Sequence, residues 1–205
     1  MLAKEEKTPD LRVRRTRQHL QQAFMELMTE KNFQAVTVQA ITERAMVNRA
    51  TFYDHFADKY ALLEYSIREW FRQTLNNKLP EDFRFSAENL RLLILTTCEF
   101  LDQLNDHCRP TDKQLLPLFE TQITTLMREI LVTWLEGAQL RESSQRSSPE
   151  LVATVVSWAI YGAALYWSQE NRAESAREFV QRVNPIILAS LNHSSAIESH
   201  KVSSQ

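Results

Sequence analysis

Apolar side chains recur at the spacing of an α-helix along most of this chain, which restricts it to helical folds. The first stripe holds Leu20, Ala23, Phe24, Leu27 and Met28, which follow i, i+3, i+4, i+7 and i+8. Similar stripes cover residues 90–104, 119–134 and 179–191. Two glycines and six prolines leave few tight turns, and no run alternates in the way strands do. The sequence therefore predicts an all-α protein.

Two short helices are expected close to the N-terminus, after a first helix over residues 14–31. Thr37 is a suitable N-cap for the first of them, and Asn48 for a second one over Arg49–Phe56. Met46-Val47-Asn48 between them indicates a tight turn. Short helices that cross over such a turn are typical of a helix-turn-helix, whose second helix enters the major groove of DNA.

The helix at Arg49–Phe56 is expected to have one apolar and one polar face. Phe52 and Phe56 lie four residues apart, so we expect both rings to be buried. The expected outward side chains are Arg49, Thr51, Tyr53 and His55. Hydroxyl, imidazole and guanidinium groups on one face suit contacts with DNA phosphates and bases. His55 has a second interpretation, as a cap on a local backbone group.

The N-terminal part of the chain is mildly basic although the whole chain has a net charge of −2. Residues 1–60 contain ten Lys and Arg against eight Asp and Glu, and residues 61–205 contain 14 against 18. Four of the six residues from Arg12 to Arg17 are arginines. A basic arm over residues 1–15 is expected to touch nucleic acid, although a solvated charge cluster is the simpler alternative.

Residues 37–63, and above all the run TFYDHFADK at Thr51–Lys59, strongly resemble the DNA-binding segment of the tetracycline-repressor (TetR) family. The resemblance begins near Arg14 and covers about the first 65 residues. It implies an all-α protein with an N-terminal three-helix DNA-binding domain and a helical ligand-binding and dimerisation domain. Met46 departs from the family pattern, because a glycine is usual at that turn position.

The resemblance also implies a set of DNA contacts. Positions matching Thr51, Tyr53, His55 and Lys59 commonly hold phosphates, although Lys59 also suits an ordinary surface lysine. Those matching Gln39, Arg49 and Ala50 face base edges, and Ala50 lacks a hydrogen-bonding side chain. The full predicted set is Arg14, Arg15, Thr37, Gln39, Asn48, Arg49, Ala50, Thr51, Tyr53, His55 and Lys59.

The remainder of the chain is expected to divide into a helical effector and dimerisation domain at 61–192 and a disordered tail at 193–205, after a DNA-binding domain at 1–60. A connector is expected at Asn76–Phe85. Residues 151–169 carry no charge and are long enough to span a bilayer, but we expect a helix buried between protein neighbours. By the resemblance, the last two helices form a homodimer, and Ala159, Gly162 and Ala163 allow close approach.

An effector pocket is a further implication of the resemblance. The candidate lining residues are aromatic or polar-tipped: Cys98, Phe119, Trp134, Trp158, Tyr161 and Tyr166. Each is also a natural core or dimer-interface residue, and that alternative stays open. A pocket rich in tryptophan suits an apolar or aromatic small molecule.

The predicted function is that of a dimeric repressor which binds double-stranded operator DNA and is released by a small-molecule effector. A ligand-independent coactivator, or a regulator controlled by a protein partner, is the alternative. An enzyme is disfavoured, because the sequence has no HExxH motif and too few glycines for a phosphate loop. We expect no cofactor, no metal site and no membrane contact. Two cysteines and the absence of a signal-peptide core predict a cytoplasmic location.

Overall fold

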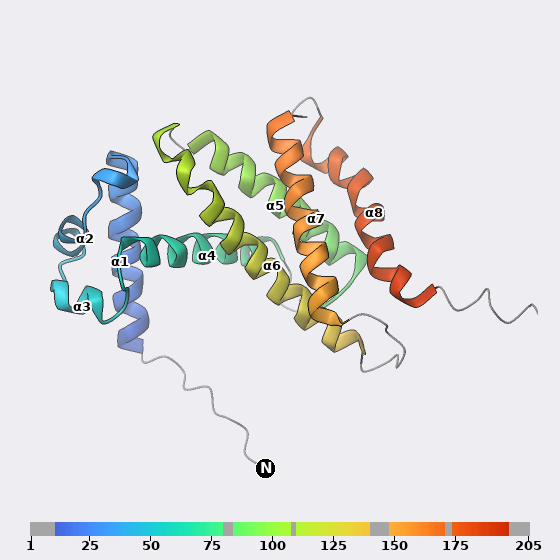
Figure 1. Cartoon of the computed structure of the whole chain (residues 1–205), viewed down its shortest axis with the longest axis horizontal. Coiled ribbons are helices and arrows are strands. Elements are labelled where there is room, and N and C mark those ends of the chain that lie inside the picture. The colour runs from blue at the N-terminus through green and yellow to red at the C-terminus, as the bar shows by residue number, and fades with distance from the viewer. Residues whose placement is uncertain (1–10, 80–83, 108–109, 140–147, 171–173, 197–205) are drawn as a thin grey trace, which may run out of the picture. The chain divides into compact units, whose positions relative to one another are not determined.

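The structure, a computed structural model, consists of helices throughout the residues that it describes (Figure 1). Those residues are 11–79, 84–107, 110–139, 148–170 and 174–196. Within these ranges every regular element is an α-helix or a short 3₁₀ turn. The predicted all-α fold class is confirmed.

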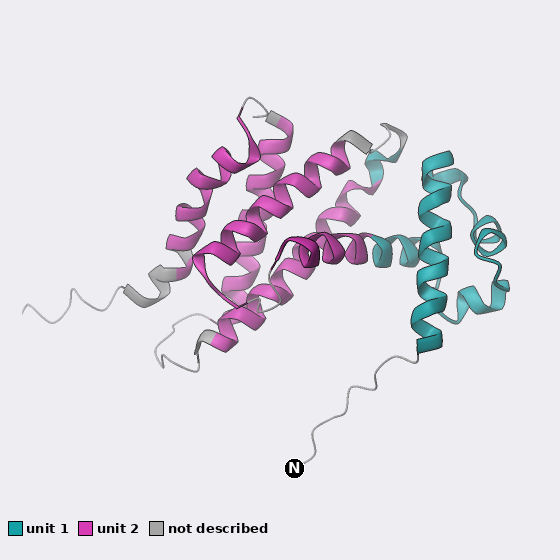
Figure 2. Ribbon diagram, turned by 180° about the vertical axis from the view of Figure 1, so that it is seen from behind, with its two compact units in different colours: residues 1–66, 109–114 teal, residues 67–108, 115–205 magenta. Residues whose placement is uncertain are grey.

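The chain divides into two compact units (Figure 2). The first contains residues 1–66 together with residues 109–114, and the second contains residues 67–108 and 115–205. The division falls inside helix α4 (Lys59–Lys78), a few residues after the expected limit at residue 60. A short segment far along the sequence therefore belongs to the N-terminal unit, which the sequence analysis did not anticipate.

The first unit is built from α1 (Leu11–Glu30), the 3₁₀ turn η1 (Phe33–Ala35), α2 (Val38–Arg44), α3 (Arg49–Tyr53) and the start of α4. The apolar stripe of α1 faces its core, as the helical spacing predicts. The fully or almost fully buried side chains include Leu20, Phe24, Leu27, Phe33, Ile41, Phe52 and Leu62. The rings of Phe24 and Phe33 meet edge to face with centroids 6.3 Å apart, which is a favoured aromatic geometry.

The second unit is a set of four long helices that continues from the second half of α4. They are α5 (Ala87–His107), α6 (Leu116–Gln139), α7 (Pro149–Glu170) and α8 (Ala176–Ala196). Helix α7 packs against α5, α6 and α8 (Figure 1). Its inner face, from Ala153 to Trp167, is buried within this unit. The 3₁₀ turn η2 (Pro110–Leu115) joins α5 to α6.

Several element ends differ from the sequence expectation. Helix α3 stops at Tyr53, although the amide of Phe56 still donates to the carbonyl of Phe52 at 2.9 Å. Helix α4 extends into the expected connector, and α6 continues past Gly137, where nothing crowds the backbone. Helix α8 reaches Ala196, so it includes the start of the expected tail. Residues 1–10 of the basic arm and residues 197–205 of the tail lie outside the described residues.

Candidate nucleic-acid interface

Side-chain caps define the two helices of the helix-turn-helix. The hydroxyl oxygen of Thr37 accepts a hydrogen bond from the amide of Ala40 at 3.1 Å, at the start of α2. The side-chain oxygen of Asn48 accepts from the amide of Ala50 at 3.0 Å, at the start of α3. Both N-caps are where the sequence predicts them. Because α2 and α3 have only seven and five residues, these caps and tertiary packing hold them in place.

The turn between α2 and α3 passes through a left-handed residue. Met46 has a φ of 53°, and among the described residues other than glycine it is the one with positive φ. The amide of Val47 donates to the carbonyl of Thr42 at 3.0 Å, which closes the end of α2. A side chain in this conformation costs about 1–2 kcal/mol, so a glycine is the less strained choice. Met46 therefore strains the turn at the position where the resemblance implies a glycine.

The helix α3 has the two faces predicted from its sequence. Phe52 is fully buried and Phe56 is 6% exposed, and their ring centroids lie 5.9 Å apart. Arg49 and Ala50 are exposed, and Tyr53 is 51% exposed while its ring rests edge-on against Phe52. The apolar side therefore anchors α3, and the polar side is left accessible. Thr51 and His55, the second expected outward pair, are half-buried.

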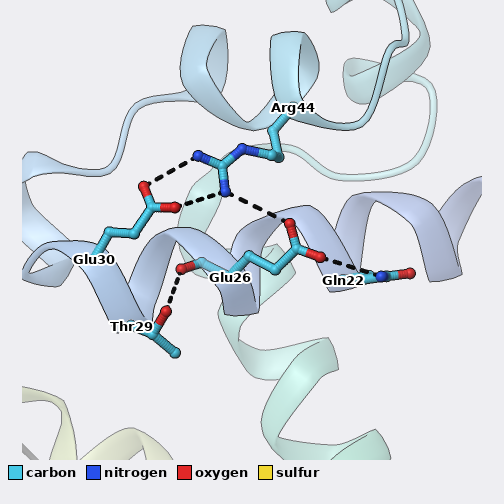
Figure 3. Close-up of polar contacts among 5 residues, drawn as sticks. All are labelled: Gln22, Glu26, Thr29, Glu30 and Arg44. Carbon is cyan, nitrogen blue, oxygen red and sulfur yellow. Dashed lines mark hydrogen bonds and ion pairs between the residues drawn. The ribbon is translucent and has the colours of Figure 1, made fainter.

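Two arginines of the helix-turn-helix have different surroundings. Arg44, at the end of α2, makes a bidentate ion pair with Glu30 of α1 at 2.8 and 3.0 Å (Figure 3). Its Nη1 also lies 3.5 Å from Glu26, which accepts a hydrogen bond from Gln22 at 3.1 Å (Figure 3). The bond from Arg44 lowers the pKa of the Glu30 carboxyl. Arg49 has no ion pair among the described residues, so its guanidinium is available to a ligand.

Lys59 has a different setting from the one expected for a phosphate contact. Its Nζ donates to the carbonyl oxygens of Phe33, Gln34 and Val36 at 2.9, 3.2 and 2.9 Å. It also lies 4.5 Å from the centroid of the Phe33 ring, and burial lowers the pKa of its ammonium group. An ammonium group has three hydrogens to donate, so all of them are committed inside the unit. Lys59 therefore has no hydrogen left to donate to a phosphate.

Other predicted contact residues use part of their polar capacity within the unit. Thr37 and Asn48 accept hydrogen bonds as caps, which leaves the hydroxyl hydrogen and the amide NH₂ free to donate. Gln39 donates to Glu43 at 2.9 Å. Arg14 and Arg15 are exposed on α1. The role of each predicted residue in binding DNA stays a prediction.

Arg17 of α1, the last arginine of the basic run, makes a contact that was not predicted from the sequence. Its guanidinium carbon lies 5.8 Å from the ring centroids of both Phe56 and Tyr65. The contact ties α1 to the aromatic anchor that follows α3, and cation–π contacts of this kind are favourable. Sequence spacing gave no signal for it, because Arg17 is far from both aromatic residues along the chain.

The six candidate pocket residues in the second unit do not share one environment. Cys98, Trp134 and Tyr161 are buried and Phe119 is half-buried. Burial raises the pKa of the Cys98 thiol and of the Tyr161 hydroxyl to about 12 in each case. Trp158 is 49% exposed on the outward face of α7. Tyr166 is also exposed there, so these two residues lie away from the interior of the unit.

Helix α7 has one face inside the unit and one outside it. Residues 149–169 are long and apolar enough to cross a membrane, and 44% of the most apolar window is buried within the chain. The exposed residues of its outer face are Leu151, Val155, Trp158, Ala159, Gly162 and Tyr166. Protein neighbours therefore cover only one side of the helix that the sequence analysis expected to be buried.

Comparisons with known proteins agree with this fold. The HTH-type transcriptional regulator YxbF of Bacillus subtilis (strain 168) is 29% identical over 187 residues, which are 86% of this chain and 46% of YxbF. This chain thus spans about half the length of that relative. The HTH-type transcriptional repressor DhaR of Mycobacterium sp. (strain GP1) is 25% identical over 185 residues, 85% of this chain and 93% of DhaR.

A solved structure and a family model complete the comparison. The flavonoid-responsive regulator FrrA matches with a TM-score of 0.57 and 21% identity, over 88% of this chain and 96% of FrrA, which shows a shared fold. The model of the bacterial regulatory proteins of the tetR family matches residues 22–65. This segment holds α2, the turn and α3 with their caps and buried phenylalanines, so the helix-turn-helix is the part of the chain that is similar to the tetR family of bacterial regulatory proteins.

Proposed function

We propose that the protein is a homodimeric transcriptional repressor that binds operator DNA through α3 and is released by a small molecule. The main observation in support of DNA binding is that α3 has one buried apolar face and one exposed polar face. Phe52 and Phe56 are buried, while Arg49, Ala50 and Tyr53 are exposed. A helix anchored in this way holds its polar side at a fixed orientation for the major groove.

Arg49 is the residue we assign to base recognition. It is exposed and forms no ion pair among the described residues, whereas Arg44 is neutralised by Glu30. A guanidinium binds the O6 and N7 atoms of guanine with two parallel hydrogen bonds. Tyr53, Thr51 and His55 supply phosphate contacts, with the exposed Arg14 and Arg15 beside them. The proposed direction of control follows DhaR, whose name describes it as a repressor.

The dimer is proposed through the outer face of α7 together with α8. Leu151 and Val155 are 57% and 58% exposed, and Ile186 of α8 is 71% exposed. Monomeric proteins rarely leave a run of large apolar side chains in water. A second copy of the chain covers such a stripe symmetrically, because a two-fold interface uses the same surface on both subunits. We therefore assign Trp158 and Tyr166 to this interface rather than to a pocket.

The effector is proposed to bind in the second unit, in the part that includes Cys98, Trp134 and Tyr161. All three side chains are buried, and a pocket lined by such aromatic and polar-tipped groups would suit a small aromatic molecule. FrrA, which shares this fold, is described as responsive to flavonoids. We propose a location in the cytoplasm, where operator DNA lies.

Selection of bound sequences from a random DNA pool tests the DNA-binding function. We expect the purified protein to enrich a two-fold symmetric sequence, with an affinity that falls as salt rises. A protein that enriches no sequence and binds DNA at no salt concentration contradicts the proposal. A thermal-shift screen of small aromatic metabolites tests the effector, because a ligand that binds the folded state raises the melting temperature.

A further inference from the structure

A buried hydrogen bond joins the segment between α5 and α6 to the turn before the helix-turn-helix. Asp112 of η2 is 5% exposed, and its Oδ1 accepts a hydrogen bond from the amide of Phe33 at 3.1 Å. Both residues belong to the first unit although they are 79 positions apart. Phe33 is the first residue of η1, and the first amides of a helical turn have no acceptor within the turn. Asp112 supplies that acceptor.

The backbone carbonyl of Phe33 also has a hydrogen-bond partner. The carbonyl oxygen of Phe33 accepts a hydrogen bond from Lys59, and Lys59 also binds the carbonyl of Val36. The Phe33 ring is fully buried between its neighbours, with the centroid of the Tyr60 ring 4.8 Å away. The backbone of η1 is thus fixed by an acidic group on its N–H side and a basic group on its carbonyl side.

The hydrogen bonds with Asp112 and Lys59 hold the backbone directly before the first N-cap of the helix-turn-helix. Val36 is the C-cap of η1, and the next residue, Thr37, is the N-cap of α2. The direction in which α2 leaves η1, and with it the placement of α3, depends on the backbone that Asp112 and Lys59 hold. We propose that Asp112 is a positioning residue for DNA binding, which acts through Phe33 and touches no DNA itself. This inference rests on the proposed function.

Asp112 also lies in a segment of chain that connects the two units. It lies in the short link between His107, the last residue of α5, and Leu116, the first of α6. Both helices belong to the second unit, where the effector is proposed to bind. The link is therefore a covalent connection between the two units in addition to α4.

The negative charge of Asp112 and its hydrogen bond are expected to have opposite effects on DNA affinity, so substitutions can separate them. Asp112→Ala removes a negative charge, and charge alone would make binding to the DNA polyanion slightly tighter. It also leaves a buried amide without an acceptor, which is costly. We expect Asp112→Ala to weaken binding to a selected operator by about fivefold or more. Asp112→Asn loses the charge but keeps an acceptor oxygen, so it should bind about as tightly as the wild-type protein.

The measurement is the dissociation constant by fluorescence anisotropy, at a temperature where circular dichroism shows each variant folded. Gln114→Ala, at an exposed neighbour on the same link, is the matched control and should bind like the wild-type protein. Wild-type affinity in Asp112→Ala, or equal weakening in Asp112→Asn, overturns the proposal. If Asp112→Ala does not fold, amide exchange in the wild-type protein decides: strong protection of the Phe33 amide supports the bond, and free exchange overturns it. Failure of the wild-type protein to bind any DNA would instead overturn the proposed function.

Discussion

Gly162 separates the stability of the single chain from that of the proposed dimer. It lies exposed in the middle of α7, and a Cβ added there meets no atom within 4 Å in the single chain. Gly162→Glu should therefore stabilise α7, since glycine in a helix interior is worse than a good helix former by about 0.5–1 kcal/mol. If the outer face of α7 is a dimer interface, the same change places a carboxylate between two apolar surfaces.

The cost to the dimer is large by comparison. A buried charge without a partner destabilises an interface by about 3 kcal/mol or more, and two-fold symmetry repeats it on the other subunit. A difference of about 3 kcal/mol corresponds to more than 100-fold in the dissociation constant of the dimer. Gly137, near the end of α6, is the matched control because it is also exposed with nothing within 4 Å.

Sedimentation equilibrium over a range of protein concentrations measures the dissociation constant, and urea unfolding under monomeric conditions measures the free energy of unfolding. Gly162→Glu should be monomeric at concentrations where the wild-type protein and Gly137→Glu are dimers. Its monomer should unfold at equal or higher urea. A Gly162→Glu protein that dimerises like the wild type refutes the interface, and a loss of helical structure in that variant refutes the open surroundings of Gly162.

Three further predictions concern single residues. Met46→Gly should raise the free energy of unfolding by about 1 kcal/mol, because relief of left-handed strain exceeds the added chain entropy; an unchanged value in urea unfolding contradicts this. Lys59→Met should lower thermal stability while the slope of log affinity against log salt stays unchanged, whereas loss of a phosphate contact would reduce that slope by about 1. Burial raises the pKa of Cys98 from 9.0 to about 12, so the unfolded chain loses its thiol proton first and stability falls as pH rises from 9 towards 12. In a Cys108→Ser background, Cys98→Ala should remove part of that alkaline loss, and urea midpoints at pH 8 and 10.5 that shift identically in both proteins contradict it.

Much of the first unit could be predicted from the sequence, because local rules determine it. The N-caps Thr37 and Asn48 and the two faces of α3 follow from residue type and spacing alone. The departure at Met46 came from the family resemblance, and the positive φ of this residue shows why a glycine is usual there. Spacing predicts which face of a short helix is buried, because a four-residue repeat returns to the same side.

Contacts between distant parts of the chain could not be predicted in this way. The bond from Phe33 to Asp112 joins positions that no periodic pattern relates, and Lys59 was expected at a phosphate rather than on three carbonyls. The exposure of Trp158 and Tyr166 has a similar cause. Helix α7 is apolar on both faces, so composition cannot tell which side packs within the chain and which side is left for another subunit.

The base preference of Arg49→Ala tests the central claim most directly. Sequences selected by the wild-type protein, by Arg49→Ala and by Arg44→Ala are compared position by position, with Arg44 as the control because it pairs with Glu30. We predict that Arg49→Ala loses about 1–3 kcal/mol of discrimination at one guanine in each half-site, while Arg44→Ala keeps the wild-type preference. An Arg49→Ala protein with the wild-type preference at every position would contradict the assignment of α3 as the recognition helix.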